Sequence, residues 1–404
     1  MLQNIPFVSS YPLESLRDFV KNKILPTALE REKTYCFPIE QYQKLHTLGY
    51  LQAVVPRQYG GEGLSTTDLT WVFREIGYGS AGMSISMAGN CLALVCISTA
   101  SESSQVKEKV FKEVLEKFSL SSFCFTEPDT GSDVFRIKTR AKTIENGYLL
   151  SGKKCFVTNA NFADHYVVIA KHEVLSNLPH VNSPETLSQS KKNGFSIFYI
   201  PRKSEGLQIG KPYRKMGLRD SNTSEIFLDQ VFVPFEHRIG LEGEGMKIAF
   251  RSIQRSRIFL AATAYGLCKR AYDITQSYLE KRVLYGAPLL TQPSIRGKLM
   301  DLKTKLEASW LLTCLAAAQW DVGNESFEFS SMAKLFAGQT TVQMVGSCVE
   351  LFGGWGCMEE YEIEKLYRDA KFFEILEGPT FVQHAILAKE ILPHFSGSTL
   401  KVAA

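Results

Sequence analysis

The sequence lacks several features that would place a protein of this size in another class. Its 46 Lys and Arg residues are interleaved with 42 Asp and Glu residues, so no basic run indicates a nucleic-acid partner. Its seven histidines show no H-E-x-x-H or similar ligand spacing, and we expect no metal site. Its nine cysteines form no C-x-x-C pair, and several lie in apolar runs, which predicts buried thiols and not disulfides.

Targeting and membrane signals are also scarce. Residues 1–11 do not combine a basic start with an apolar stretch, and they lack the Arg-rich composition of a transit peptide. No apolar stretch is expected to approach the roughly 18 residues of a membrane span. We therefore expect a cytoplasmic protein with no membrane partner.

Two common nucleotide-binding patterns are missing as well. The Gly-rich segment 56–63 lacks the Lys-Ser/Thr ending of a P-loop, so a structural turn is the better interpretation. Gly240, Gly243 and Gly245 do not fit G-x-G-x-x-G, because Ile248 takes the final position and no βαβ pattern precedes it. A Rossmann site is therefore not expected.

The residues that are present divide the 404-residue chain into three parts with an α+β fold. Residues 1–118 have helical periodicity and predict an N-terminal α-helical domain. Residues 119–235 predict a middle β domain, a barrel or sheet, with a hairpin turn at Asn146-Gly147 and a polar exposed loop at 173–194. Residues 236–404 predict a C-terminal four-helix bundle.

Apolar stripes at helical spacing support the predicted bundle. One stripe comprises Leu299, Leu302, Leu306, Trp310, Thr313 and Ala317, and a second comprises Met332, Leu335, Phe336, Gln339 and Val342. We expect both stripes to face the core of the bundle.

Two short motifs carry the chemistry. Thr126-Glu-Pro-Asp-Thr-Gly-Ser-Asp133 predicts a turn that presents small hydroxyls and backbone N–H groups to a polar or anionic part of a cofactor. Ile375-Leu-Glu-Gly-Pro-Thr380 places one carboxylate, Glu377, on a Gly-Pro turn directly before a helix. Between them lie Phe156-Val-Thr-Asn159, the turn at Arg282, and Glu350-Leu-Phe-Gly-Gly-Trp-Gly356.

In order and separation these segments resemble the acyl-CoA dehydrogenase family, which binds FAD and oxidises acyl thioesters. The resemblance covers nearly the whole chain. It implies that Thr126 hydrogen-bonds the flavin, that Phe156 stacks near it in place of an indole, and that Arg282 reaches the FAD pyrophosphate of a neighbouring subunit. The implied cofactor-binding residues are Phe123, Phe125, Thr126, Ser132, Phe156, Val157, Thr158, Arg282, Tyr285, Gln292, Glu350, Gly353 and Gly354.

The same resemblance assigns Glu377 as the catalytic base. Oxidation of a thioester at Cα–Cβ removes an α proton while a hydride leaves Cβ for the flavin, so a base must face the flavin across the substrate. Desolvation would raise the pKa of that carboxylate toward working pH. Some relatives place the base on an earlier helix, at the position of Ser256 here. The alternative is a Glu that only complements a helix dipole.

The substrate end leaves two carriers open. The resemblance implies substrate contacts from Ser132, Arg257, Leu376 and Gly378. Gln254 replaces a carboxylate that contacts the pantetheine in many relatives, and Asn324 and Glu325 occupy a region where relatives often carry an Arg for CoA. Pro379 and Phe381 replace the usual Thr and Gln that touch the partner subunit's adenine. The acyl group could therefore be carried by CoA or by an acyl-carrier protein.

The activity implied is FAD-dependent α,β-dehydrogenation of an acyl thioester by a homotetramer or homodimer, with electron-transferring flavoprotein as the expected reoxidant. Retention of Glu377 favours dehydrogenation over hydroxylation. The alternatives are a flavin oxidase or monooxygenase of the same fold that uses O₂, and a non-catalytic scaffold.

Overall fold

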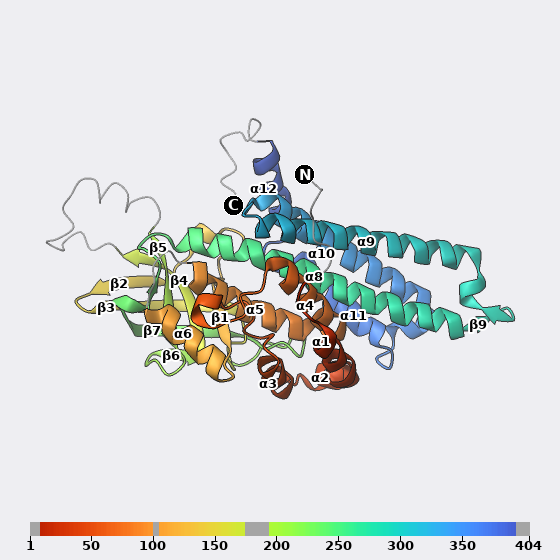
Figure 1. Cartoon of the computed structure of the whole chain (residues 1–404), viewed down its shortest axis with the longest axis horizontal. Helices are drawn as coiled ribbons and strands as arrows, with labels where there is room; N and C mark the ends of the chain where they lie inside the picture. Colours follow the sequence, from red (N-terminus) through yellow and green to blue (C-terminus); the bar gives the residue numbers. More distant parts are fainter. Residues whose placement is uncertain (1–8, 100–104, 174–193, 393–404) are drawn as a thin grey trace.

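The structure is a computed structural model that describes residues 9–99, 105–173 and 194–392. The sheet, which is central in the sequence, lies at one end of the elongated molecule, and the long C-terminal helices extend from it toward the other end (Figure 1). The N-terminal helices are α1 (Glu14–Phe19), α2 (Ala28–Thr34), α3 (Ile39–Thr47), α4 (Thr66–Gly79), α5 (Ala81–Thr99) and α6 (Gln105–Glu116). Ser65 caps α4, because its hydroxyl accepts the backbone N–H of Asp68.

Helix α5 corrects one expectation from the sequence. It is the one described helix that is long and apolar enough to cross a membrane, so the prediction that no stretch approaches that length was wrong. In this structure 89% of its most apolar window is buried inside the protein. Because neighbours cover α5 on all sides, it needs no polar face and forms part of the core.

The middle part is an open sheet and not a closed barrel. Its strands are β1 (Ser121–Cys124), β2 (Arg140–Ile144), β3 (Gly147–Thr158), β4 (His165–Glu173), β5 (Phe195–Pro201), β6 (Leu207–Ile209), β7 (Thr223–Pro234) and β8 (Arg238–Ile239). Among them the order is β6-β7-β3-β2-β4-β5-β8, with β1 parallel to β4. Strands β2 and β3 pair antiparallel across Asn146-Gly147, as the hairpin signal predicted. The expected loop at 173–194 falls outside the described residues except at its ends.

Three long helices dominate the C-terminal part: α8 (Gly245–Lys281), α9 (Pro293–Asp321) and α10 (Phe327–Phe352). A two-stranded turn, β9 (Val283–Leu284) and β10 (Ala287–Pro288), connects α8 to α9. Two shorter helices, α11 (Glu362–Ala370) and α12 (Thr380–Ile391), follow α10 in the described part of the chain.

The two predicted stripes had different outcomes. All six residues of the α9 stripe are buried. The α10 prediction was wrong, because Met332, Leu335 and Phe336 are only partly buried. The buried face of α10 instead carries smaller side chains such as Ala333, Ala337, Thr341 and Cys348, which permit closer packing against the neighbouring helices.

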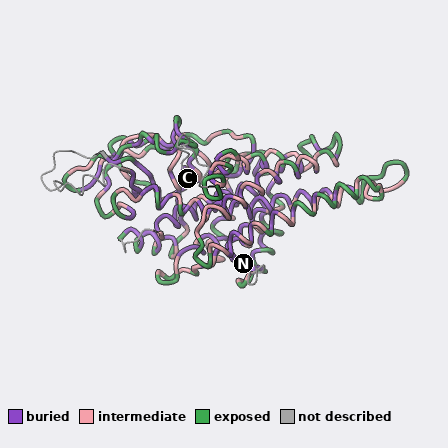
Figure 2. Tube along the Cα trace, turned by 90° about the horizontal axis from the view of Figure 1, so that it is seen from above, coloured by how far each residue is buried: buried purple, intermediate pink, exposed green. Residues whose placement is uncertain are grey.

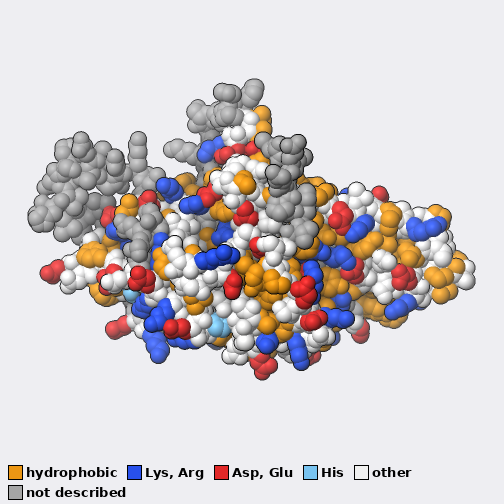
Figure 3. Space-filling view, viewed as in Figure 1, with side chains coloured by type: hydrophobic (Ala, Val, Ile, Leu, Met, Phe, Trp, Pro, Cys, Tyr) orange, Lys and Arg blue, Asp and Glu red, His pale blue; other side chains and the backbone are white. Residues whose placement is uncertain are grey.

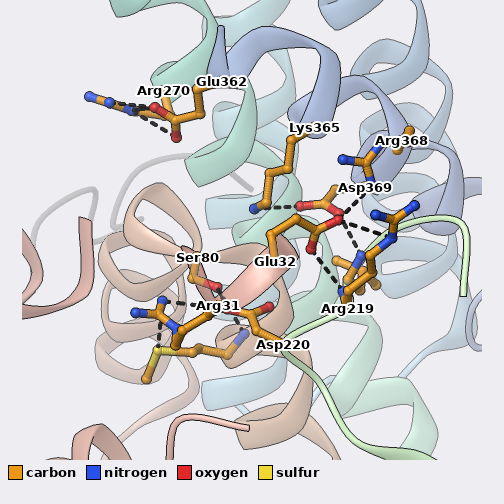
Figure 4. Close-up of polar contacts among 12 residues, drawn as sticks. Arg31, Glu32, Ser80, Arg219, Asp220, Arg270, Glu362, Lys365, Arg368 and Asp369 are labelled. Atoms are coloured by element: carbon orange, nitrogen blue, oxygen red, sulfur yellow. Dashed lines mark hydrogen bonds and ion pairs between the residues drawn. The ribbon is translucent and has the colours of Figure 1, made fainter. Parts of the chain in front are cut away.

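A buried charge cluster joins the three parts of the chain (Figure 4). It contains Glu32 from α2, Asp220 from the loop before β7, and Asp369 from α11, each at most 1% exposed. Lys365 Nζ lies 2.7 Å from the carboxylate of Asp369, and Arg31 Nε lies 3.4 Å from that of Asp220. Because every carboxylate is near a cation, the cluster can fix the loop before β7 against both helical parts.

Candidate active site

The first motif folds into a tight turn after β1. Glu127 and Thr130 exchange two backbone hydrogen bonds of 3.1 Å each. The carbonyl of Thr126 accepts the backbone N–H of Cys155 at 2.9 Å, and this bond places the turn beside β3. Two sequence motifs, the turn and the Phe156 segment, therefore meet at one place.

Glu127 is a buried support of this turn that the sequence interpretation missed. Its carboxylate accepts the backbone N–H of Lys138 at 2.6 Å, the N–H of Thr139 at 2.9 Å, the Thr139 hydroxyl, and Lys154 Nζ at 2.9 Å. Lys154 Nζ also donates to the carbonyl of Phe125 at 3.0 Å. A Glu inside the first motif and a Lys two residues before Phe156 were the available signals.

Both members of this pair have shifted pKa values. Burial raises the pKa of Glu127, but the charge of Lys154 and the surrounding hydrogen bonds outweigh it and hold that pKa below its ordinary value. Burial lowers the pKa of Lys154 to about 8, and Glu127 offsets part of that effect. The pair therefore remains an ion pair at neutral pH.

Strand β3 has a bulge at Phe156. Its register with β7 shifts between Lys154 and Val157, and Phe156 has φ of 54°. This bulge leaves the Phe156 ring 66% exposed, 5.5 Å from the ring of Tyr213. An exposed aromatic ring beside a polar turn suits stacking on a planar heterocycle.

The turn has room and donors for a flavin. The Thr130 hydroxyl is buried and has no hydrogen-bond partner among the described residues. A Cβ added at Gly131 would meet no atom within 4 Å, so open space adjoins the turn. An unpaired buried hydroxyl next to open space is compatible with a bound group that has polar edges.

The second motif forms a strained turn between η8 (Lys371–Glu374) and α12. Glu377 has φ of 54° and Gly378 has φ of 99°, both left-handed. Arg257 Nε donates to the carbonyl of Glu377 at 3.1 Å, and Lys334 Nζ donates to that of Gly378 at 2.6 Å. Gln383 Nε2 donates to both carbonyls. These three buried side chains fix the backbone of the turn.

The carboxylate of Glu377 has few partners of its own. The Ser256 hydroxyl donates to Oε1 at 2.5 Å, whereas Oε2 has no hydrogen-bond partner among the described residues. Burial raises the pKa of Glu377 to about 7, and Ser256, Arg257 and Lys334 limit the rise. A group with this pKa can both accept and release a proton near neutral pH.

The structure brings Arg257, Leu376 and Gly378 together with Glu377. Leu376 is partly buried and packs against the main core. Gln254 is held away from solvent, with its Nε2 donating to the carbonyl of Glu325 at 3.0 Å. Ser132 instead lies exposed on the turn of the first motif.

The remaining cofactor candidates gather at the far end of α8. Arg282, Glu350, Gly353 and Gly354 line one pocket of about 600 Å³. A Cβ at either glycine would meet no atom within 4 Å, so the pocket wall is open there. At 1.5 Å per residue, Arg282 lies about 37 Å along α8 from Arg257. The pocket is therefore remote from the carboxylate of Glu377.

Figures 1 and 2 show this separation. Helix α8 runs from beside the sheet to the β9 turn at the opposite end of the molecule, where the trace is mostly exposed. Tyr285 in this turn is 96% exposed, and Gln292 precedes the first residue of α9. Neither residue contacts the turn of the first motif within the described chain.

Three family models match the chain, one after another. Residues 12–116 match the N-terminal domain of acyl-CoA dehydrogenases, residues 122–231 the middle domain, and residues 243–392 the C-terminal domain. The chain is 32% identical over 380 residues to cyclohexane-1-carbonyl-CoA dehydrogenase of Geobacter metallireducens, covering 94% of this chain and 96% of that protein.

Solved structures show the same fold. Butyryl-CoA dehydrogenase from Megasphaera elsdenii superposes with a TM-score of 0.86 at 30% identity, covering 94% of this chain and 97% of that one. The prolyl acyl carrier protein oxidase AnaB superposes with a TM-score of 0.85 at 26% identity, over 94% and 97% of the two chains. Another similar structure is an FAD complex, and FAD is the cofactor that the family binds. The chain belongs to the acyl-CoA dehydrogenase family.

Proposed function

We propose that this protein removes an α proton and a β hydride from an acyl thioester, with Glu377 as the base. The observation that carries the proposal is a buried carboxylate with a pKa of about 7 and one unpaired oxygen. When bound, FAD supplies the hydride acceptor. Glu377 takes the α proton, and the nearby charges of Arg257 and Lys334 favour its ionised form before the reaction.

The turn of the first motif and the bulge of β3 would hold the isoalloxazine. Phe156 offers the exposed ring, and Thr126 and Thr158 belong to the two segments that the Thr126–Cys155 backbone bond joins. The buried pair of Glu127 and Lys154 supports the turn from the protein interior. Phe123 and Phe125, whose ring centroids are 5.6 Å apart, would line the same side. We further propose that residues 1–118, 119–235 and 236–404 form the N-terminal helical, middle β and C-terminal helical domains.

A second copy of the chain would complete the FAD site. The pocket at Arg282 is remote from the turn of the first motif, so a neighbouring subunit would bring it to the pyrophosphate. Val283, Leu284 and Met300 are large apolar side chains that are exposed near that end. Figure 3 shows hydrophobic side chains on the surface of the same end of the molecule. Such exposure fits a buried surface in a homodimer or homotetramer.

Replacing the Arg282 side chain tests this arrangement. Arg282→Ala should weaken FAD binding roughly 10- to 150-fold, because one charge-assisted phosphate contact is lost. Lys281→Ala removes a neighbouring exposed charge and serves as the matched control. Full FAD retention in Arg282→Ala, or tight FAD binding by a stable monomer, would contradict a shared site.

The carrier of the acyl group is CoA or a carrier protein. Gln254 is bound to a backbone carbonyl in this chain, and Pro379 and Phe381 stand where relatives contact the nucleotide. The likeness to a protein named as an acyl carrier protein oxidase supports the second carrier. Electron-transferring flavoprotein as reoxidant and a cytoplasmic site of action rest on family membership and sequence alone.

Anaerobic reduction of the bound flavin tests the activity directly. The purified holoenzyme is mixed with one acyl group on CoA, on pantetheine and on a carrier protein, and the loss of flavin absorbance is recorded. Bleaching by a saturated thioester supports dehydrogenation, and the ratio of kcat/KM values identifies the carrier. Rapid reoxidation by O₂ would indicate the oxidase alternative, whereas absence of bound flavin would leave only a scaffold.

A further inference from the structure

The two oxygens of the Glu377 carboxylate differ in their surroundings. Oε1 accepts a 2.5 Å hydrogen bond from the hydroxyl of Ser256, a residue of α8 that is 1% exposed. Oε2 is buried and has no hydrogen-bond partner among the described residues. Each carboxylate oxygen has two lone pairs, so the Ser256 bond occupies one of the two on Oε1, whereas both on Oε2 are free to accept a proton.

We propose that Ser256 is a positioning residue for the base: its hydroxyl fixes Oε1 of Glu377, so that Oε2 receives the α proton. The inference rests on the proposed function. In the step, the Cα–H bond breaks, an O–H bond forms on Oε2, and the electron pair remains on the substrate as an enolate. Bound FAD would supply the acceptor for the hydride that must leave Cβ, so that the electron pair left at Cα forms the Cα–Cβ double bond.

The fixed turn limits which side chains can donate a hydrogen bond to the carboxylate of Glu377. Glu377 lies in a left-handed turn whose carbonyls are bound by Arg257, Lys334 and Gln383, so the backbone cannot easily turn the carboxylate elsewhere. In the part of the chain that the structure describes, Ser256 is the only side chain that hydrogen-bonds to the carboxylate itself. Its loss would therefore leave both oxygens without a donor from the protein.

Other charges around Glu377 come from three elements. Arg257 on α8 and Lys334 on α10 both favour the ionised carboxylate. Glu374 in η8 acts on Lys334, and Gln383 on α12 is neutral. None of these groups donates to Oε1 or Oε2 in the described residues, so none substitutes for the Ser256 hydroxyl.

Removing the hydroxyl should favour the protonated base. A hydrogen bond to a charged group contributes enough to shift a pKa by about one unit or slightly more. The base must be ionised to act, so the acid limb of the kcat/KM profile of Ser256→Ala should move to higher pH by about one unit. At pH values below this limb, activity should fall about tenfold relative to the wild type.

Two variants make the comparison specific. Ser256→Thr retains a hydroxyl and should keep the acid limb near its wild-type position. Ser252→Ala removes another fully buried hydroxyl of α8, which donates to the carbonyl of Ile248 at 2.9 Å, and should leave the limb unchanged. An unshifted limb in Ser256→Ala, or an equal shift in Ser252→Ala, overturns the proposal.

A spectroscopic readout separates this inference from the proposed function. The pH-difference infrared spectrum of the holoenzyme, minus that of Glu377→Gln, should contain a carboxyl band that titrates higher in Ser256→Ala. If Glu377→Gln reacts normally with substrate, the proposed function fails. If Glu377→Gln is inactive but the band titrates identically in Ser256→Ala and wild type, only the role of Ser256 fails.

Discussion

Glu127 and Glu377 are two buried carboxylates in two motifs, yet their surroundings are opposite. Glu127 accepts four hydrogen bonds, including one from a buried cation, and its pKa is lowered. Glu377 accepts one, from a neutral hydroxyl, and its pKa is raised to about 7. The contrast indicates that burial alone does not make a base. The counter-charge of Lys154 and the larger number of donors together hold Glu127 in its ionised form, and Glu377 has neither a directly bonded cation nor a second donor among the described residues.

The cations near the two residues differ in the same way. Lys154 donates directly to Glu127, and the two charges form a 2.9 Å pair. Arg257 and Lys334 instead donate to backbone carbonyls of the turn that carries Glu377. They stabilise the position of the base and leave one of its oxygens unpaired. The first region thus holds its carboxylate rigidly in the ionised form. The second holds the backbone of the turn in place and leaves the carboxylate of Glu377 available to accept a proton.

The largest expected effect is on catalysis by Glu377→Gln. The amide keeps the shape of the side chain but cannot accept the proton as a carboxylate does, so substrate-dependent flavin reduction should fall by several orders of magnitude. Stopped-flow anaerobic reduction measures it, with far-UV circular dichroism and FAD content as controls for folding. A rate within about tenfold of wild type would remove Glu377 from the role of base.

The second expected effect is on stability, from Glu127→Gln. Breaking a buried ion pair leaves Lys154 without a counter-charge and should lower the unfolding free energy by roughly 3–5 kcal/mol. Denaturant titration of the holoenzyme measures the loss, and FAD retention should fall with it, since Lys154 also holds the Phe125 carbonyl. The double variant Glu127→Gln/Lys154→Met should recover part of the loss. If the single variant is as stable as wild type, Glu127 does not support the turn.

Much of the fold was predictable, because its signals are local. Strand residues bounded by Gly, Pro and Asn indicated the sheet, and a regular stripe indicated the buried face of α9. The buried face of α10 was not predictable by the same rule. There small residues such as Ala337 face the neighbouring helices, and larger ones such as Phe336 are only partly buried. Where two helices pack closely, small side chains are buried between them, so a stripe of large hydrophobic residues does not identify the buried face.

The site was predictable only as far as its motifs extend. Glu377 and the turn at Thr126 are recognisable in sequence, and the structure brings Arg257 beside Glu377. The bonds from Ser256, Lys334 and Lys154 join residues separated by 27 or more positions, so no local pattern reports them. Long-range polar contacts depend on how the helices and the sheet pack.

The third prediction concerns the pH dependence of stability. Glu377 titrates near 4.5 when unfolded and near 7 when folded, so its contribution is fully present below pH 4.5 and is lost as the pH rises to about 7. Wild type should therefore lose up to about 3 kcal/mol across this range relative to Glu377→Gln. Denaturant midpoints of both proteins at pH 4.5 and pH 8 measure the difference.

Glu127 should show the opposite sign. Its folded pKa is lowered, so its contribution is present above the unfolded pKa and is lost as the pH falls through the folded pKa. The stability difference between wild type and Glu127→Gln should therefore shrink in acid. If the stability differences for Glu127→Gln and Glu377→Gln changed in the same direction with pH, the two carboxylates would not have opposite pKa shifts.

The smallest expected effect comes from Thr139→Val, which removes one of the four donors to Glu127. Thr139 is fully buried, and its backbone N–H would still donate to the carboxylate at 2.9 Å, as would Lys138 and Lys154. We expect a loss of about 1 kcal/mol in unfolding free energy, with FAD content and the acid limb of kcat/KM unchanged. Ser256→Ala removes the one donor of Glu377, so it should shift the acid limb, and it should cost stability only at pH values where Glu377 is ionised. If Thr139→Val destabilises as much as Glu127→Gln, the four bonds to Glu127 act as a single unit and donor number alone does not separate the two carboxylates.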